Sequence, residues 1–245
     1  MNYRLTIQYD GTRFDGWQRQ GNTDNTIQGK LEEALFQVTG ERAELHGAGR
    51  TDAGVHALGQ VASVRLERDV PPEELRRGLN RLLPGDIAVT AAEEAGARFH
   101  ARLNATGKTY RYAVRLGDVP DVFRRRFQLQ LDEKLDLAAM EEAAALLTGR
   151  HDYRSFCGNK KLKKSSIRTV DAIVLRRRGD DLTFTFHGDG FLYHMVRILT
   201  GTLLEVGRGE RPPGDMPAIL AARDRAAAGA TAPARGLTLV EVDYN

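Results

Sequence analysis

Residues 43–67 read AELHGAGRTDAGVHALGQVASVRLE, in which two short apolar runs flank a loop containing four glycines. The runs at 43–46 and 60–67 are typical of strands, so the stretch predicts a strand–loop–strand unit. Glycine tolerates positive φ and the close approach of another backbone, so four of them indicate an unusual local path. One carboxylate, Asp52, lies in this loop beside the guanidinium of Arg50. We expect this acid to act as an aimed nucleophile or base rather than as a solvated loop residue.

Two phosphate-binding motifs do not fit the loop. A dinucleotide fingerprint requires a third glycine where this chain has Asp52, and a carboxylate there would repel a pyrophosphate. A Walker A loop requires lysine after its last glycine, but Gly54 is followed by Val55. We therefore expect no nucleotide phosphate to bind here.

The pattern around the loop predicts a β-α-β-β-α-β order in the first half of the chain, which is the split ferredoxin-like motif. Residues 3–9 alternate apolar and polar side chains, as a half-buried strand does, and residues 26–38 have the apolar spacing of a helix. A second helix begins at Pro71, where prolines precede acids, as is typical of a helix N-terminus. A further strand is expected at 87–91.

The second half repeats the theme less regularly. We expect strands at 108–116, 169–176, 182–187 and 237–242, with helices at 137–147, 191–206 and 216–227. The predicted class is α+β, with two ferredoxin-like (split β-α-β) halves. Their mainly antiparallel sheets are expected side by side, forming a central cleft, with helices on the outer face. The best boundary lies within 93–107, which gives domains 1–104 and 105–245.

Composition excludes several classes of protein. The 245 residues are 41% hydrophobic and 28% charged, as in an ordinary globular chain. No stretch approaches the roughly 20 apolar residues of a membrane span, and the N-terminus enters a strand pattern at once, so we expect no signal peptide. The single cysteine, Cys157, excludes an internal disulfide and favours a cytoplasmic location.

Charge is distributed unevenly along the chain. Residues 1–100 hold 12 Lys and Arg against 15 Asp and Glu, whereas residues 101–245 hold 24 against 18. Ten of the cations lie between Arg150 and Arg178, opposed by only two acids and accompanied by Tyr153 and Phe156. This composition favours a polyanion track, because neutralised phosphates release counterions. The candidate contacts to an RNA backbone are Lys160, Lys161, Lys163, Lys164 and Arg168.

Two more positions are candidates for chemistry. Tyr110 and Tyr112 share one face of an expected strand, and Tyr110 is suited to stack on a base. Arg197 lies in a helix otherwise apolar enough to be buried, where a guanidinium needs a partner, and Asp52 across the cleft would be one. The six histidines lack metal-ligand spacing, so no metal is expected. No G-x-S-x-G motif occurs, and one singled-out acid disfavours simple glycoside hydrolysis.

These residues resemble the tRNA pseudouridine synthase A family over nearly the whole chain. The resemblance rests on five motifs in order, and the catalytic-loop motif is highly specific. The family usually has Asn after the helix arginine, where this chain has Ile198. The matching motifs are Tyr9-Asp10-Gly11…Gly16-Trp17-Gln18-Arg19-Gln20, Gly49-Arg50-Thr51-Asp52-Ala53-Gly54-Val55-His56, Phe99-His100-Ala101-Arg102, Tyr110-Arg111-Tyr112 and His194-Met195-Val196-Arg197.

The resemblance implies isomerisation of uridine to pseudouridine at positions 38, 39 and 40 of the tRNA anticodon arm. It also implies a homodimer bridged by tRNA, and no cofactor. Asp52 is similar to the family's nucleophile, Tyr110 to the ring that stacks on the target uracil, and Arg197 to the cation that pairs with Asp52. Arg50 is similar to a side chain that displaces the target base. The RNA-contacting segment comprises Phe99, His100, Ala101, Arg102 and Leu103.

Two other functions are alternatives to this one. A non-catalytic RNA-binding module is the first alternative, but the strand at 108–114 lacks the aromatic-glycine signature of such modules. A nucleotide-dependent oxidoreductase is the second, and it lacks the glycine fingerprint. Whether Asp52 attacks the sugar or the uracil, or removes a sugar proton, is left open by the sequence.

Overall fold

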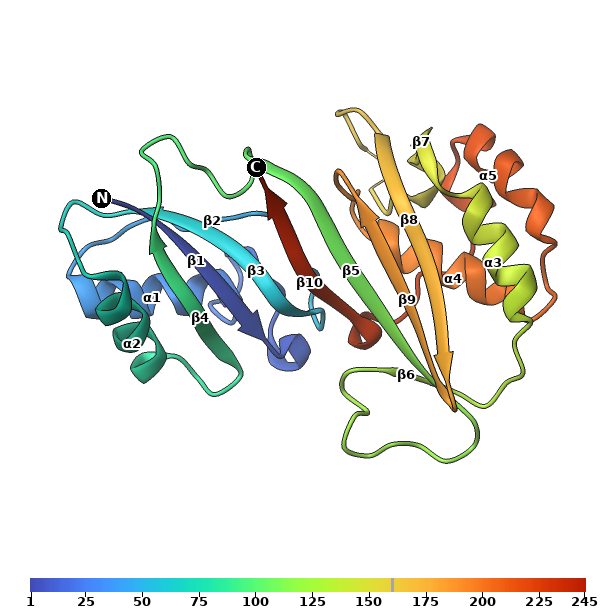
Figure 1. Cartoon of the computed structure of the whole chain (residues 1–245), viewed down its shortest axis with the longest axis horizontal. Coiled ribbons are helices and arrows are strands. Elements are labelled where there is room, and N and C mark those ends of the chain that lie inside the picture. Colours follow the sequence, from blue (N-terminus) through green and yellow to red (C-terminus); the bar gives the residue numbers. More distant parts are fainter. Residues whose placement is uncertain (160) are drawn as a thin grey trace. The chain divides into compact units, whose positions relative to one another are not determined.

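The computed structural model describes residues 1–159 and 161–245, which divide into two compact units (Figure 1). Unit 1 comprises Met1–Thr106 and Thr238–Asn245, and unit 2 comprises Gly107–Leu237. The described chain has five α-helices and ten strands, most of them paired antiparallel, so the fold is mixed α+β.

Unit 1 is a sheet covered by two helices. Its strand order is β4-β1-β3, all antiparallel neighbours. The other edge of β3 is shared, because β2 pairs antiparallel with its C-terminal part while β10 pairs parallel with its first residues. Helices α1 and α2 contact each other on one side of this sheet (Figure 1). The elements are β1 (Asn2–Tyr9), α1 (Ile27–Thr39), β2 (His46–Gly47), β3 (His56–Arg65), α2 (Pro72–Leu82), β4 (Ile87–Glu94) and β10 (Leu237–Tyr244).

The core of unit 1 follows from the alternation in β1. Leu5 and Ile7 are fully buried, while Arg4 and Thr6 beside them are partly exposed. Leu31 and Leu35 of α1 are equally buried, one turn apart on the helix. The helix begins where the Thr26 side chain accepts a hydrogen bond from the Gly29 N–H at 3.2 Å.

Unit 2 has the strand order β5-β9-β8-β7, again antiparallel throughout, with the short β6 parallel to β5. Three helices gather beside β8 and β9 (Figure 1). The helix α3 contacts both α4 and β8 and has Asp136 as its N-terminal cap. The elements are β5 (Ala105–Leu116), β6 (Leu129–Leu131), α3 (Leu137–Leu146), β7 (Gly149–Asp152), β8 (Ile167–Arg178), β9 (Asp181–Gly188), α4 (Met195–Gly207) and α5 (Met216–Ala222).

Two helix predictions had wrong boundaries. The helix predicted from 191 begins at Met195, because His194 has φ 61°, in the left-handed region that interrupts a helix. The helix predicted to reach 227 ends at Ala222, where Arg223 has φ 52°. In both cases a non-glycine residue adopts a conformation that its identity does not signal.

The predicted strand at 43–46 was also wrong. Only His46 and Gly47 pair with β3. At Leu45 the backbone is held by α1 instead, since its N–H donates to Glu32 and its carbonyl accepts from Gln28. Side chains from the helix thus satisfy backbone groups that a sheet would otherwise pair.

Candidate active site

Asp52 lies in the loop that joins β2 to β3, and its side chain is partly buried. The loop closes at Gly54, whose φ of 79° is accessible to glycine with little strain. A hydrogen bond of 3.1 Å from the Val55 N–H to the Asp52 carbonyl completes this turn. Arg50, two residues before the acid, is exposed. The loop therefore holds a carboxylate in a defined turn and leaves a guanidinium free of the core.

A second segment, residues 10–17, supports the loop from behind. The Trp17 N–H donates to the Thr51 carbonyl at 3.0 Å. A Cβ on Gly16 would lie 2.7 Å from that same carbonyl oxygen, and one on Gly11 would collide with the Val55 carbonyl. Two backbones meet here without room for side chains, so these positions require glycine.

Two glycines in the strands that flank this loop are required by close packing. A Cβ on Gly47 would lie 2.5 Å from the fully buried Trp17 ring. One on Gly59 would collide with the Val240 carbonyl of β10. The prediction that the glycines serve an unusual or closely approached backbone is confirmed at Gly47, Gly54 and Gly59.

His56, at the start of β3, is buried and packs against the supporting segment. Its Nδ1 lies 3.1 Å from the Gly11 N and 3.2 Å from a carboxylate oxygen of Asp10. The imidazole therefore links β3 to residues 10 and 11, as expected of a hydrogen-bonding histidine. In the described part of the chain, no group of three or more His, Cys, Asp or Glu residues is arranged to hold a metal ion.

In unit 2, Tyr110 and Tyr112 share the buried face of β5, as predicted. Tyr110 is only 7% exposed, and its ring lies 5.2 Å from that of Phe191 in a nearly perpendicular arrangement. Tyr112 is fully buried and donates its hydroxyl to the Pro233 carbonyl at 2.8 Å. Burial raises the pKa of the Tyr112 phenol, while the nearby positive charge of Arg197 acts in the opposite direction. Arg197 therefore lies close to this tyrosine face.

Arg197 is partly rather than fully buried on α4, which corrects the expectation of a buried guanidinium. Its Nε donates to the Ala232 carbonyl at 2.7 Å, and the Ala232 N–H donates back to the Arg197 carbonyl at 3.1 Å. Ile198 beside it is fully buried in the core. A loop after α5 thus fixes the guanidinium through its Nε. Residue types do not signal this pair of hydrogen bonds, because the partner is a backbone carbonyl.

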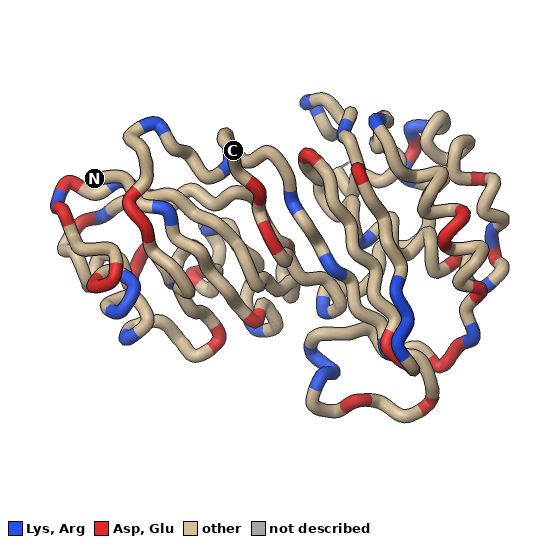
Figure 2. The backbone as a smooth tube through the Cα atoms, in the orientation of Figure 1, with Lys and Arg blue, Asp and Glu red and all other residues tan. Residues whose placement is uncertain are grey.

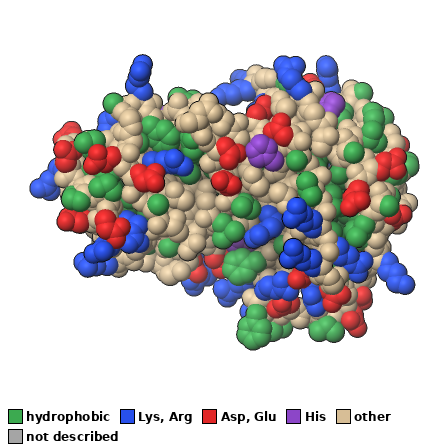
Figure 3. Space-filling model, viewed as in Figure 1, with side chains coloured by type: hydrophobic (Ala, Val, Ile, Leu, Met, Phe, Trp, Pro, Cys, Tyr) green, Lys and Arg blue, Asp and Glu red, His purple; other side chains and the backbone are tan. Residues whose placement is uncertain are grey.

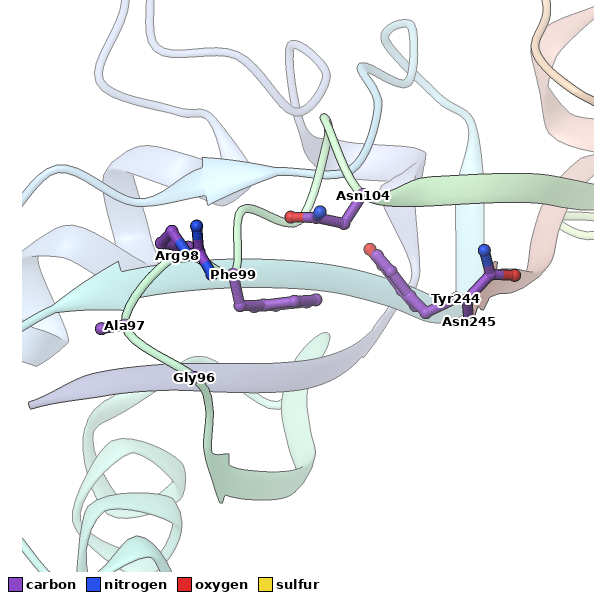
Figure 4. Close-up of a pocket in the computed structure, with 7 residues that line it drawn as sticks. All are labelled: Gly96, Ala97, Arg98, Phe99, Asn104, Tyr244 and Asn245. Carbon is purple, nitrogen blue, oxygen red and sulfur yellow. The ribbon is translucent and has the colours of Figure 1, made fainter.

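The segment after β4 places Phe99 and Tyr244 next to each other, with ring centroids 5.2 Å apart. Ala101 is buried, and its carbonyl accepts from the Tyr244 hydroxyl at 2.6 Å. Arg102 and Leu103 are exposed, Leu103 to 77%. An open groove of about 430 Å³ lies here (Figure 4), lined by Gly96, Ala97, Arg98, Phe99, Asn104, Tyr244 and Asn245. The His100 ring stacks on that of His46 with centroids 5.0 Å apart, and the backbone N–H of His100 donates to the Asn104 side chain.

The basic run divides into two groups at opposite ends of β8. Lys161, Lys163 and Lys164 are exposed in the loop before this strand, and Arg168 is partly buried with its guanidinium bonded to the Ser165 and Ile167 carbonyls. The arginines at 176–178 are exposed at the far end, and Figure 2 shows both basic groups in blue. Lys160 lies outside the described residues.

The aromatic residues of the basic run do not face solvent. Tyr153 and Phe156 are fully buried, and the Tyr153 hydroxyl donates to the Leu147 carbonyl at 2.6 Å. The expectation that these two aromatics accompany the cations in a polyanion track was therefore wrong. They belong to the core beneath the run, because a 3-10 turn at 154–156 directs them inward.

The candidate residues are thus distributed over both units. Unit 1 holds Asp52, Arg50 and the 99–103 segment, and unit 2 holds Tyr110, Arg197 and the basic run. Within unit 2 the structure brings Arg197 to the tyrosine face of β5. The pairing of Arg197 with Asp52 stays a prediction.

The model of one protein family, described as tRNA pseudouridine synthase, matches residues 5–104 and 143–245, which include Asp52 and Arg197 but not Tyr110. The chain belongs to the tRNA pseudouridine synthase family. It is accordingly an isomerase that converts uridine to pseudouridine in tRNA.

Curated relatives match almost end to end. Proteins named tRNA pseudouridine synthase A from Bacillus sp. (strain KSM-64) and Brevibacillus brevis are 45% and 46% identical over 243 and 241 residues, covering 99% and 98% of both chains. One of the same name from Moorella thermoacetica is 47% identical over 242 residues, 98% of each chain. A chain from the "Crystal Structure of a Cbf5-Nop10-Gar1 Complex" aligns at 15% identity and a TM-score of 0.42, over 97% of this chain and 48% of that one.

Replacing Arg197 with lysine tests whether geometry matters beyond charge. Lysine keeps the positive charge but cannot donate from an Nε to Ala232 while directing two further nitrogens at an anion. We expect pseudouridine formation to fall by about 10- to 100-fold, the cost of a misplacement near 1 Å. The matched control is Arg208→Lys at the end of the same helix, whose Nε pairs with the exposed Glu133 at 2.5 Å. Equal rates for the two variants would contradict a geometric role.

Proposed function

We propose that this enzyme isomerises uridines at positions 38, 39 and 40 of the tRNA anticodon arm, with Asp52 as its essential carboxylate. The observation that carries the proposal is the loop of Asp52, held on one side by the supporting segment and on the other by β3. A carboxylate in so constrained a turn is suited to act at one atom of one substrate. The full-length similarity to relatives named tRNA pseudouridine synthase A supports the same assignment.

The reaction balances without an oxidant or a cofactor. The N1–C1′ glycosidic bond breaks, the uracil rotates, and a C5–C1′ bond forms. The proton lost from C5 equals the one gained at N1. Attack on the sugar, attack on the uracil and removal of a sugar proton each require the Asp52 carboxylate ionised and aimed. Carboxylate chemistry therefore suffices for every route left open.

The other candidates take distinct roles in this proposal. Arg197 pairs with Asp52 and keeps it ionised, since a neighbouring cation favours the charged form of an acid. Tyr110 stacks on the target uracil, and Phe191 fixes the orientation of its ring. Arg50, exposed beside the acid, displaces the target base from its stack. Eversion of a base costs a few kcal/mol, which stacking on an aromatic ring offsets.

The groove beside Phe99 supports RNA binding by the 99–103 segment. It presents an aromatic ring, the Arg98 guanidinium and the Asn104 side chain, which suit a base plane, a phosphate and a base edge (Figure 4). Arg102 and Leu103 are exposed next to it. We assign the segment from Phe99 to Leu103 to contacts with the tRNA outside the target base.

The finer fold and location belong to the same proposal. In unit 1 the order β4-β1-β3-β2, with helices after β1 and β3, is that of a ferredoxin-like sheet. In unit 2, β5, β9 and β8 with α3 and α4 follow the same order in part. We assign residues 1–104 and 105–245 as the two domains, the second of which lends residues 238–245 to the sheet of unit 1, and the cytoplasm as the location. None of the helices in the described chain has the length and apolarity of a membrane span.

Asparagine at position 52 keeps the shape of the side chain and removes its negative charge. We expect Asp52→Asn to abolish pseudouridine formation while the affinity for tRNA changes by less than about threefold, because phosphate contacts supply most RNA affinity. Asp69→Asn, which alters an exposed acid in the turn before α2, is the control and should retain full turnover. Pseudouridines are mapped at single-nucleotide level in a tRNA transcript. Pseudouridine formation by Asp52→Asn would contradict the nucleophile assignment. If the unaltered protein binds tRNA without forming pseudouridine, the RNA-binding module is favoured instead.

The lysines before β8 are expected to contact phosphates. We predict that the triple change of Lys161, Lys163 and Lys164 to Ala lowers the slope of log affinity against log salt by about 2 units, at about 0.7 per phosphate. The control removes the same charge at the other end of the strand, by changing Arg176, Arg177 and Arg178 to Ala. An unchanged slope for the lysine variant would make that loop a solvated surface.

A homodimer is supported by apolar side chains on the loop between β5 and β6. Phe123 is 90% exposed and Val119 68%, and Figure 3 shows green side chains protruding there. A monomer rarely exposes such a cluster, so we assign this loop to the contact with a second copy. We expect the unaltered protein to sediment as a dimer and Phe123→Asp as a monomer. The control, Leu82→Asp at the end of α2, should stay dimeric. A monomeric unaltered protein would contradict the proposal.

A further inference from the structure

Three buried polar side chains meet behind the loop that carries Asp52. The Tyr9 hydroxyl, at the end of β1, lies 2.9 Å from the Thr51 hydroxyl, which immediately precedes the acid. On β3, the side-chain amide of Gln60 donates to the Gly49 carbonyl at 2.9 Å and lies 3.5 Å from the Tyr9 hydroxyl. Tyr9 is 4% exposed and Gln60 is fully buried. Two neighbouring strands thus each extend one polar group to the loop.

These contacts fix the loop on both sides of Arg50. Gly49 is held through its carbonyl by Gln60. Thr51 is held twice, through its side chain by Tyr9 and through its carbonyl by the Trp17 N–H. Hydrogen bonds therefore fix the backbone at Gly49 and Thr51, the second of which directly precedes Asp52.

Stability alone does not account for the polar groups at these positions. The interior of a sheet core accepts Phe and Leu without any hydrogen-bonding requirement, whereas buried polar atoms must find partners. The Oε1 of Gln60 is buried without a hydrogen-bond partner in the described chain. An unpaired buried oxygen opposes folding, so the amide is retained at a cost. The Tyr9 phenol remains protonated, because burial raises its pKa.

We propose that Tyr9 and Gln60 are positioning residues for the isomerisation, which act on Asp52 through Thr51 and Gly49 without contacting the substrate. The proposal rests on the function proposed above, because it takes Asp52 as the essential carboxylate. If the carboxylate is displaced by a fraction of an ångström from its target atom, the rate of the chemical step falls while the affinity for tRNA stays unchanged. The signature of this role is a fall in the rate of the chemical step at unchanged tRNA binding.

The same strand offers a matched control. Tyr3 is another buried tyrosine of β1, near its first residue, and its hydroxyl also makes two hydrogen bonds, to the Val70 carbonyl at 2.9 Å and from the Val70 N–H at 2.8 Å. Tyr3→Phe and Tyr9→Phe each delete one buried hydroxyl from one strand. They differ in that only Tyr9 contacts the loop of Asp52.

The experiment measures single-turnover pseudouridine formation with enzyme in excess, the tRNA dissociation constant, and the melting temperature. We expect Tyr9→Phe to lower the single-turnover rate about 10- to 100-fold with the dissociation constant within about twofold. Tyr3→Phe should lower the melting temperature by a comparable amount and leave the rate within about twofold. A normal rate for Tyr9→Phe, or an equal loss for Tyr3→Phe, would overturn the proposal.

A double-mutant cycle tests the path through Thr51. Tyr9→Phe and Thr51→Val each remove one partner of the same hydrogen bond, so the double variant should be no slower than the slower single variant. Multiplied losses would show that the two residues act separately and would overturn this path. If Asp52→Asn is inactive while Tyr9→Phe is fully active, only the positioning role fails. If Asp52→Asn still forms pseudouridine, the proposed role of Asp52 is itself contradicted, and the positioning role falls with it.

Discussion

The contact of two backbones at the loop of Asp52 is the constraint on which the site depends. The Trp17 N–H reaches the Thr51 carbonyl only because Gly11 and Gly16 present no side chain to the loop. A hydrogen bond between two backbones contains no rotatable side-chain bond, so it restrains the loop directly. An acid attached to such a loop is oriented before the substrate binds, which lowers the entropic cost of the reaction. The buried Trp17 ring extends this constraint to Gly47 on the other side of the loop.

Each unit builds its share of the site from a different kind of restraint. In unit 1 the acid is fixed by backbone contacts and buried side chains on β1 and β3. In unit 2 the guanidinium of Arg197 projects from a helix and is held by a carbonyl of a following loop. That loop is itself anchored on α4, because the Gly229 N–H donates to Thr202 and the Ala230 N–H donates to Glu205. The helix α4 thus positions Arg197, and the loop that contains Ala232 orients its guanidinium.

Sequence reasoning worked where local pattern and tertiary packing agree. The alternation of β1 and the helical spacing of α1 are read directly from residue types, and both are as predicted. It failed where a single backbone angle sets the end of a helix, as at His194 and Arg223. Their positive φ values are not signalled by the residue type. It also failed at Tyr153 and Phe156, because charge runs suggest a surface while a short 3-10 turn directs both rings into the core. Of the candidate site, Asp52 and Arg197 carry strong sequence signals, but their supports are carbonyl groups and buried residues that look like ordinary core.

Some residues of this core only pack, whereas others also hold the loop of Asp52 in place. Leu5 and Ile7 on β1 pack against apolar side chains, and any residue of similar volume would serve there. Tyr9 continues the same buried face but ends in a hydroxyl, and it does so at the one point where β1 reaches the loop of Asp52. Gln60 does the same on β3, with one oxygen left unpaired. At Tyr9 and Gln60 the polar atoms hold the loop of Asp52, whereas the buried hydroxyl of Tyr3 holds the backbone at Val70. Hydrogen bonds suit such positioning because they have direction and apolar contacts do not.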